Sequence, residues 1–372
     1  MQEVVMNDKA KVRWGILGAA RINDKLMPAI VNASNAQLVA IASRRTGAAE
    51  QTLEKYAPEH KDSVKIYSSR DELLDDPDVD VVYIPLANHE HAEWTLHAIR
   101  RGKHVLCEKP MALHVNAIEE IYIAANEHNV KVMEGFMYRF HPQHNRVREI
   151  IDSGAIGEIR SVRSCFSFMM RPERRYRLVE SVENGGGAFW DIGCYAIHTI
   201  RRFFPEQPLA ITVFSKFIES GADIGSSGII DYGHGKFAQF DFSFDRARRC
   251  EYELIGTQGG IKCHNVWAMP NDAPVISWWT EAGQREEEVL TPANHFQLEV
   301  EHFSQCVLDD TEPALSLWDA KNNCQIITAA LQSVQEQKAI TGNPLNLWTF
   351  KRKKSREVHN VTDSNNDDFW EA

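Results

Sequence analysis

The chain has 372 residues, 43% of them hydrophobic, and a formal net charge of -11 at pH 7. A chain of this length buries a large core and more often forms two domains than one. The acidic balance argues against broad binding to nucleic acids or acidic membranes, because both need a basic surface. Small molecules are therefore the expected partners.

The first residues, Met-Gln-Glu-Val-Val-Met-Asn-Asp, carry acids where a secretion signal needs basic residues, and no later stretch approaches 18 unbroken apolar residues. We therefore expect a cytoplasmic protein. Seven scattered cysteines, never spaced as Cys-x-x-Cys, predict buried thiols rather than a disulfide framework or a zinc site. His89 and His91 lie beside two glutamates, but positions two apart do not share a helix face, so no metal site is expected there.

Residues 12–134 alternate strand-like and helix-like segments, which is the pattern of a doubly wound parallel sheet. The apolar periodicity of 89–101 is typical of a helix that covers such a sheet. We expect a nucleotide-binding domain over 10–135. Its six predicted strands are 12–17, 37–42, 64–67, 80–84, 104–107 and 131–134.

After residue 135 the pattern changes to short alternating runs separated by turn signals such as Gly233-His-Gly. This predicts a second α/β domain over 136–345 with a large, mostly antiparallel open sheet, whose last helices are free to cross back to the first domain. Residues 351–372 are expected to form a mobile tail. The predicted helices are 142–152, 296–309 and 317–338, and the predicted strands are 158–169, 209–219, 227–233, 236–244, 250–255, 260–264 and 274–279.

A nucleotide-binding signature ends the first strand and opens a helix. Gly18 fits the tight turn that lets the backbone approach a pyrophosphate at a helix N-terminus. Measured against Gly-x-Gly-x-x-Gly, however, Ala20 and Asn23 replace the second and third glycines, so a plain strand-to-helix turn is the alternative. The candidate cofactor residues of this turn are Gly18, Ala20, Arg21 and Ile22.

The second strand ends in Ser43-Arg44-Arg45 and not in the acid that would hold a ribose 2′-hydroxyl. A hydroxyl and two guanidinium groups suit a 2′-phosphate, which an acid would repel. NADP is therefore favoured, with NAD possible. The alternative is that both arginines are surface residues at a helix start.

The fifth strand ends in Glu108-Lys109-Pro110, at the edge of an α/β sheet where ligands collect. The proline restricts Lys109 to an extended conformation and so fixes the direction of its side chain. Taken alone, the tripeptide more often marks a solvated turn. Asn88 and His91 follow the fourth strand. Without a functional role, Asn88 would be a helix N-cap and His91 an ordinary histidine of the first helical turn.

Five motifs follow one another along the chain. Together they resemble the glucose-fructose oxidoreductase, inositol dehydrogenase and rhizopine-catabolism (Gfo/Idh/MocA) family, over residues 10–345. The resemblance implies a Rossmann domain, an α/β domain with an open sheet that builds homo-oligomers (dimers or tetramers), and NAD(P)-dependent oxidation or reduction of sugars, polyols or related carbonyl compounds. The motifs are Gly18-Ala-Ala, Ile84-Pro-Leu-Ala-Asn88-His-Glu-His91, Glu108-Lys109-Pro110, Met133-Glu-Gly-Phe-Met-Tyr-Arg139 and Gly185-Gly-Gly-Ala-Phe-Trp-Asp191-Ile-Gly-Cys-Tyr195.

Carried over by position, the resemblance makes Lys109 the signature lysine, close to the reacting oxygen and the nicotinamide. Tyr195 falls on the proton-transfer position, which is tyrosine in the glucose-fructose oxidoreductase and dihydrodiol dehydrogenase branches. Asp191, four residues earlier, would share a helix face with Tyr195 and bind a substrate hydroxyl. The resemblance places Leu86, Asn88, His91 and Glu108 on the cofactor side and Arg139 on the substrate side, while Arg171, Arg175 and Tyr176 are further substrate candidates outside any motif.

The chemistry agrees with these roles. An alcohol carbon loses a hydride only as its hydroxyl proton leaves, so an acid/base group is needed beside the cofactor. We expect the ammonium of Lys109 to lower the pKa of Tyr195 from about 10 toward the working pH. The alternative for Tyr195 is a buried helix tyrosine with a satisfied hydroxyl.

The sequence therefore predicts an NADP-dependent oxidoreductase that acts on a sugar or cyclic polyol, like an aldose 1-dehydrogenase, a xylose dehydrogenase or a dihydrodiol dehydrogenase. A reductase of a keto, anhydro or deoxy sugar would use the same residues in the reverse direction. A non-catalytic NADP-sensing regulator is the alternative outside the enzymes.

Overall fold

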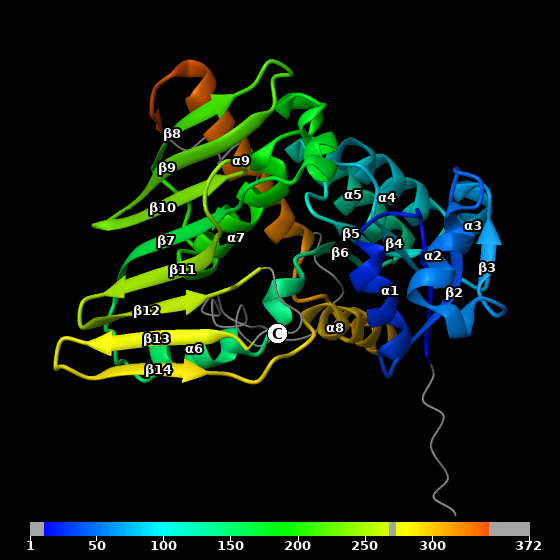
Figure 1. Cartoon of the computed structure of the whole chain (residues 1–372), viewed down its shortest axis with the longest axis horizontal. Helices are drawn as coiled ribbons and strands as arrows, with labels where there is room; N and C mark the ends of the chain where they lie inside the picture. The colour runs from blue at the N-terminus through cyan, green and yellow to red at the C-terminus, as the bar shows by residue number, and fades with distance from the viewer. Residues whose placement is uncertain (1–10, 268–272, 342–372) are drawn as a thin grey trace, which may run out of the picture.

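The computed structural model describes residues 11–267 and 273–341. Two sheets lie beside each other with helices packed between and around them (Figure 1). We call the parallel sheet and its helices the N-terminal unit, and the larger sheet and its helices the C-terminal unit. The expected tail at 351–372 lies outside the described residues.

The N-terminal unit is a six-stranded sheet in which every neighbouring pair is parallel. Its strands are β1 (Val12–Ile16), β2 (Ala36–Ala42), β3 (Lys65–Tyr67), β4 (Val81–Ile84), β5 (His104–Glu108) and β6 (Val132–Gly135). The order β3-β2-β1-β4-β5-β6 reverses direction between β1 and β4, and ligands bind at such a switch point. The helices are α1 (Asn23–Asn32), α2 (Ala48–Tyr56), α3 (Arg70–Asp75), α4 (His91–Arg100) and α5 (Val115–His128).

The C-terminal unit is a nine-stranded sheet that is antiparallel except for one parallel pair, β7 with β10. Its order is β14-β13-β12-β11-β7-β10-β9-β8-β15. The mixed α/β class and the two predicted sheets are confirmed. The strands are β7 (Ile159–Ser167), β8 (Ala210–Phe217), β9 (Asp223–Gly233), β10 (Lys236–Ser243), β11 (Arg249–Gly256), β12 (Gly259–His264), β13 (Val275–Thr280), β14 (Arg285–Val289) and β15 (Ile340–Thr341).

The last two helices cross back toward the N-terminal unit, as the sequence allowed. The helix α8 (His295–Asp309) packs against α1, and the indole of Trp14 in β1 donates a 3.0 Å hydrogen bond to Ser304 in α8. The helix α9 (Leu317–Glu336) packs against α5 and β8, so it joins both units. No helix in the described ranges is long and apolar enough to cross a membrane. The cytoplasmic location stays a prediction.

Two further helices belong to the C-terminal unit. The helix α6 (Gln143–Asp152) confirms the prediction at 142–152. The helix α7 (Cys194–Phe203) is buried along its whole length and follows a π-helical turn over Phe189–Gly193. All seven cysteines are buried free thiols, as expected.

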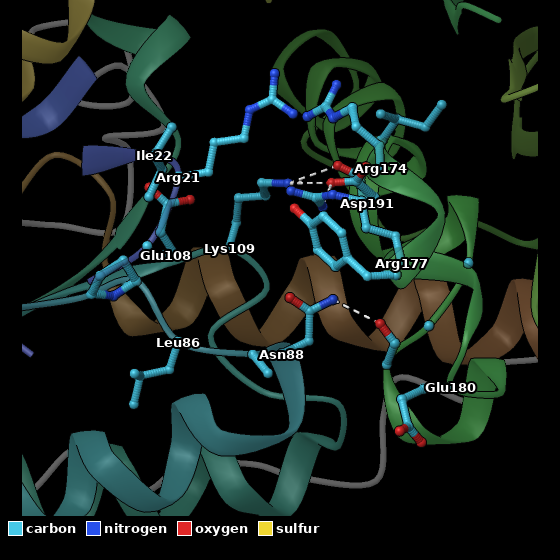
Figure 2. Close-up of a pocket in the computed structure, with 18 of the residues that line it drawn as sticks. Arg21, Ile22, Leu86, Asn88, Glu108, Lys109, Arg174, Arg177, Glu180 and Asp191 are labelled. Atoms are coloured by element: carbon cyan, nitrogen blue, oxygen red, sulfur yellow. Dashed lines mark hydrogen bonds and ion pairs between the residues drawn. The ribbon is translucent and has the colours of Figure 1, made fainter. Parts of the chain in front are cut away.

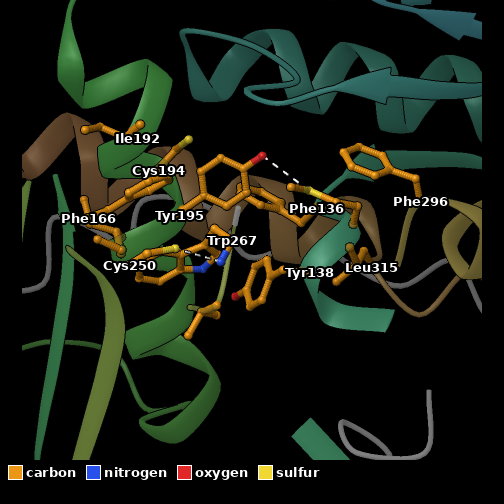
Figure 3. Packing of buried hydrophobic residues seen from close by; sticks show 14 of the residues in the cluster. Phe136, Tyr138, Phe166, Ile192, Cys194, Tyr195, Cys250, Trp267, Phe296 and Leu315 are labelled. Atoms are coloured by element: carbon orange, nitrogen blue, oxygen red, sulfur yellow. Dashed lines mark hydrogen bonds between the residues drawn. The ribbon is translucent and has the colours of Figure 1, made fainter. Parts of the chain in front are cut away.

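An aromatic cluster surrounds the start of α7 (Figure 3). The rings of Phe136 and Tyr195 meet edge to face with centroids 5.3 Å apart, and Phe166 stacks on Trp267 at 5.0 Å. Such buried aromatic pairs contribute apolar burial and fix ring orientation. The cluster therefore holds Tyr195, at the start of α7, in one position beside the ends of β5 and β6.

Candidate active site

A cavity of about 990 Å³ lies between the carboxyl ends of the parallel strands and the C-terminal unit. Sites for small molecules and cofactors usually have this size and position. The N-terminal unit contributes the turns after β1 and β4 and the end of β5 to its lining. The predicted residues among its lining are Ala20, Arg21, Ile22, Arg45, Leu86, Asn88, His91, Glu108, Lys109, Arg171, Tyr176, Asp191 and Tyr195.

The turn after β1 is built for close approach of a ligand to the backbone. Gly18 has a φ of +151°, and a Cβ there would lie 3.0 Å from a methyl carbon of Leu86. The side chain of Asn23, which replaces the third glycine of the signature, donates a 2.9 Å hydrogen bond to the carbonyl of Gly18. Asn23 thus fixes the turn by a hydrogen bond. The turn leads directly into α1, whose N-terminus favours an anion, and this fits a cofactor pyrophosphate.

The structure separates the two arginines predicted to bind a 2′-phosphate. Arg45 lines the cavity, and its guanidinium donates a hydrogen bond to the carbonyl of Ala19. Arg44 lies outside the lining and forms a 3.3 Å ion pair with Glu90. Ser43 is also outside the lining, and its hydroxyl accepts a hydrogen bond from the backbone N–H of Arg45. Of the three residues predicted to bind the 2′-phosphate, only Arg45 therefore lines the cavity.

His91 is the first residue of α4, as its alternative as a first-turn histidine expected, and its ring also joins the ends of two strands. It is buried, with Nδ1 2.7 Å from the carbonyl oxygen of Pro110 and Nε2 3.0 Å from that of Leu86. Burial lowers the pKa of His91 to about 4, so the imidazole is neutral at pH 7 and donates to one of the two carbonyls. His91 thus supports the cavity wall that Leu86 and Lys109 form.

Asn88 crosses the cavity to the C-terminal unit. Its side-chain amide donates a 2.7 Å hydrogen bond to the carbonyl of Gly185 (Figure 2), and it caps no helix. The N-cap alternative for Asn88 is therefore wrong. The bond ties the β4 end to the glycine-rich segment that precedes Asp191.

Lys109 is held against Asp191 by two contacts. Its ammonium donates a 2.7 Å hydrogen bond to the main-chain carbonyl of Asp191 and lies 3.4 Å from Oδ1 of the carboxylate. Arg177 contacts the same carboxylate oxygen. Burial raises the pKa of Asp191, but the charges of Arg177 and Lys109 outweigh burial, and the pKa lies below its usual value. Asp191 is therefore an ionised group between two cations.

Asp191 and Tyr195 both line the cavity, but they do not share an α-helical face as predicted. Asp191 belongs to the π-helical turn, and α7 begins only at Cys194. Within the described residues, Oδ2 of Asp191 is buried without a hydrogen-bond partner. An unpaired carboxylate oxygen at a cavity wall is suited to accept a hydrogen bond from a hydroxyl group.

The surroundings of Tyr195 correct one expectation. The ammonium of Lys109 lies 4.7 Å from the centroid of the Tyr195 ring, while the phenol hydroxyl contacts the sulfur of Met137 at 3.4 Å. The pKa of Tyr195 is raised well above 10, because burial disfavours the phenolate and Glu108 adds to the effect. The predicted lowering of the pKa by Lys109 is therefore wrong, because burial has the largest effect and acts in the opposite direction. Tyr195 is a protonated phenol at neutral pH.

The substrate-side arginines also differ from expectation. Arg139 is buried in the 3₁₀ segment Met137–Phe140 and does not line the cavity, and Arg175 also lies outside the lining. Arg171 and Tyr176 do line it, together with three arginines that the motifs did not indicate. For Arg174 and Arg177 the signal was present in their spacing from Arg171, because residues three apart eclipse in a 3₁₀ helix such as Pro172–Leu178. The arginines of this wall are Arg171, Arg174, Arg177 and Arg248.

Comparison with known proteins places this site in a family. The sequence model of an oxidoreductase family with an NAD-binding Rossmann fold matches residues 12–136, and that of the GFO/IDH/MocA C-terminal domain matches 144–262. The NADP-dependent D-xylose 1-dehydrogenase 2 of Haloferax volcanii is 31% identical over 330 residues, which cover 88% of this chain and 98% of that protein. The chain belongs to the Gfo/Idh/MocA family. The resemblance read from the five motifs is thus confirmed, together with the oxidoreductase class.

Two further relatives span the same length. The trans-1,2-dihydrobenzene-1,2-diol dehydrogenase of Xenopus tropicalis is 30% identical and covers 87% of this chain and 98% of its own. A 3-ketoreductase from Actinomadura kijaniata, solved with NADP and TDP-benzene, matches with a TM-score of 0.80 and 29% identity over 87% of this chain and 98% of that chain. These family members include both dehydrogenases and a reductase, so the family alone leaves the direction of the reaction open.

Proposed function

We propose that this protein is an NADP-dependent oxidoreductase that transfers a hydride between the nicotinamide and a carbon of a sugar or cyclic polyol. The observation that carries the proposal is the convergence of Lys109, Asp191 and Tyr195 on the cavity that the Gly18 turn and Arg45 also border. In this assignment, residues 10–135 bind the cofactor and residues 136–345 bind the substrate. The NADP-linked relatives support the choice of cofactor.

Each side chain of the site has a separate role in the reaction. When bound, the nicotinamide supplies or accepts the hydride. Lys109 directs its ammonium at the oxygen of the reacting carbon and stabilises the negative charge that develops there. Tyr195 gives its proton to that oxygen in reduction and takes it back in oxidation. The free Oδ2 of Asp191 accepts a hydrogen bond from a neighbouring substrate hydroxyl.

The protonated state of Tyr195 favours a second candidate function, the reduction of a keto, anhydro or deoxy sugar. The raised pKa keeps the phenol protonated at neutral pH, which is the form that gives a proton to an oxygen that receives a hydride, and it leaves little phenolate to act as a base. A non-catalytic NADP sensor is disfavoured because such a protein needs neither Lys109 nor Tyr195 at the cavity.

Incubation with cofactor and substrates distinguishes these functions. We expect absorbance of the reduced nicotinamide to rise with NADP and one member of a panel of pentoses, hexoses and cyclic diols. If it falls instead with NADPH and the corresponding keto or anhydro sugars, the reductase is the correct function. Binding of NADP without turnover in either panel would favour the sensor.

Arg45 is expected to select NADP. Arg45→Ala should weaken the binding of NADP about tenfold or more and that of NAD little, because a well-formed hydrogen bond between an arginine and a phosphate contributes about 1.5–3 kcal/mol. Arg44→Ala is the matched control, since Arg44 pairs with Glu90 outside the cavity lining. Fluorescence titration of both cofactors measures the effect. An equal loss of NADP and NAD affinity in Arg45→Ala would show that this arginine does not bind the 2′-phosphate.

The outer face of the large sheet suits a contact between subunits. Phe214, Ile229 and Phe237, on the adjacent strands β8, β9 and β10, are 78%, 53% and 45% exposed. Exposed apolar side chains gathered on one sheet face mark an interaction surface. We expect a dimer or tetramer in light scattering after size exclusion, and a smaller species for Phe214→Glu. Ile123→Glu, at a 53% exposed apolar position on α5, is the control, and a monomeric wild-type protein would contradict the assignment.

A further inference from the structure

Two arginines from opposite walls of the cavity face each other. Arg21 lies in the turn between β1 and α1 of the N-terminal unit, and Arg174 lies on the 3₁₀ segment of the C-terminal unit. Figure 2 shows their guanidinium groups pointing toward one another, at the end of the cavity opposite to Glu180. Two positive charges in this position repel each other unless an anion lies between them.

Neither guanidinium has a carboxylate partner within the described ranges, where no aspartate or glutamate oxygen lies within 4.0 Å of either group. The guanidinium of Arg174 lies 5.5 Å from the ring centroid of Phe168, and its Nε is buried without an acceptor. Burial lowers the pKa of Arg174, and the charges of Arg177 and Arg21 lower it further, against the opposing effect of Asp191. Arg174 is thus a cation that packs near Phe168 and has an N–H donor without an acceptor.

The acids that line the cavity do not supply the missing charge. The carboxylate of Asp191 contacts Lys109 and Arg177. Glu108 accepts a 2.7 Å hydrogen bond from the hydroxyl of Tyr83. The two other lining acids form no ion pair with either arginine among the described residues, and they are Glu173 and Glu180.

The position of Arg174 indicates the origin of the anion. A cofactor pyrophosphate is already provided for by the turn at Gly18 and the N-terminus of α1. Arg174 instead stands on the wall that also carries Asp191, where the substrate must lie. On this wall three arginines recur every third residue of one segment, Arg171, Arg174 and Arg177.

We propose that Arg21 and Arg174 together bind an anionic group of the substrate, a carboxylate or a phosphate, and that the preferred substrates are therefore acidic sugars. The planar guanidinium group binds both kinds of oxyanion through paired hydrogen bonds. This inference rests on the proposed function. It assigns to the substrate Arg21, which the sequence placed on the cofactor side. A neutral sugar leaves both cations uncompensated.

Equilibrium binding tests the proposal without any need for turnover. D-glucuronate, D-glucose 6-phosphate and D-glucose are titrated by calorimetry into the NADP-saturated protein. We expect at least one acidic sugar to bind tenfold or more tightly than D-glucose, and the identity of that sugar tells carboxylate from phosphate. Arg174→Gln and Arg21→Gln should reduce the preference to less than twofold. Arg175→Gln, at an exposed neighbour outside the cavity lining, should keep it.

Two results would overturn the proposal. One is a wild-type protein that binds neither acidic sugar more tightly than D-glucose. The other is a tenfold loss of NADP affinity in Arg174→Gln with the acid preference unchanged, because the arginine would then bind the cofactor diphosphate. Turnover of neutral sugars without acid preference would leave the proposed function intact. Acid-selective binding without turnover of any sugar would instead contradict the proposed function and leave the anion site standing.

Discussion

Replacing Lys109 with alanine should lower kcat at least a hundredfold while the fold and the affinity for NADP change little. The ammonium of Lys109 is held against Asp191 at the cavity wall, where it stabilises charge on the reacting oxygen. The loss of one preorganised donor of this kind typically lowers kcat by about 10²–10³. The Asp191 carboxylate keeps its contact with Arg177 in the variant, so the site should not collapse. Turnover, melting temperature and NADP titration measure the three quantities.

Lys131→Ala is the control for this experiment. Lys131 is a lysine in ion pairs with Asp310 and Glu312 and lies outside the cavity lining, so its loss should leave kcat unchanged. A Lys109→Ala enzyme that retains more than about a tenth of wild-type kcat, a loss below roughly 1.4 kcal/mol, would show that the lysine is not catalytic.

The strands of both sheets could be predicted where their apolar pattern is strong. The fully buried β4 and the alternating β10 show the two patterns expected of parallel and half-exposed strands. The strand β14 was missed because it reads Arg-Glu-Glu-Glu-Val and lies at the sheet edge, where its pairing with β13 and not an apolar face defines it. The two-residue β15 is too short to leave any periodicity.

The sequence predicted those residues of the site that lie within the recognised motifs. Lys109 and Asp191 are far apart in sequence, and the ordered motifs brought them together correctly in one cavity. Motif membership fails for Arg139, because it says nothing about the direction of the side chain, which is buried away from the cavity. Arg174 is found only by combining its spacing with the 3₁₀ geometry of its segment.

The pKa of Tyr195 could not be predicted from the sequence, for a different physical reason. Proximity of Lys109 was predicted correctly, but a charge shifts a pKa according to where it stands relative to the ionising oxygen. Here the ammonium lies 4.7 Å from the ring centroid, and Tyr195 is buried within the aromatic cluster (Figure 3). Burial therefore dominates, and it acts in the direction opposite to the predicted shift.

Tyr195→Phe should lower kcat by about 10²–10⁴ with little change in KM, because it removes the proton-transfer group and keeps the ring. The melting temperature should change little, since the hydroxyl contacts only the weak acceptor sulfur of Met137 among the described residues. Steady-state kinetics and thermal unfolding of the two proteins measure these effects. Tyr252→Phe, at a buried tyrosine of β11 outside the cavity lining, is the control and should retain its turnover.

The pH dependence of the wild-type enzyme should report the raised pKa of Tyr195. The protonated phenol is the reactive form for reduction, so the reductive kcat should stay level as the pH rises and fall only above pH 10. Oxidation needs the proton acceptor, so its kcat/KM should keep rising through pH 10 without a plateau, and this slope should vanish in Tyr195→Phe. A slope that persists in Tyr195→Phe but is lost in Asp191→Asn would move proton transfer to the carboxylate of Asp191, which lines the same cavity.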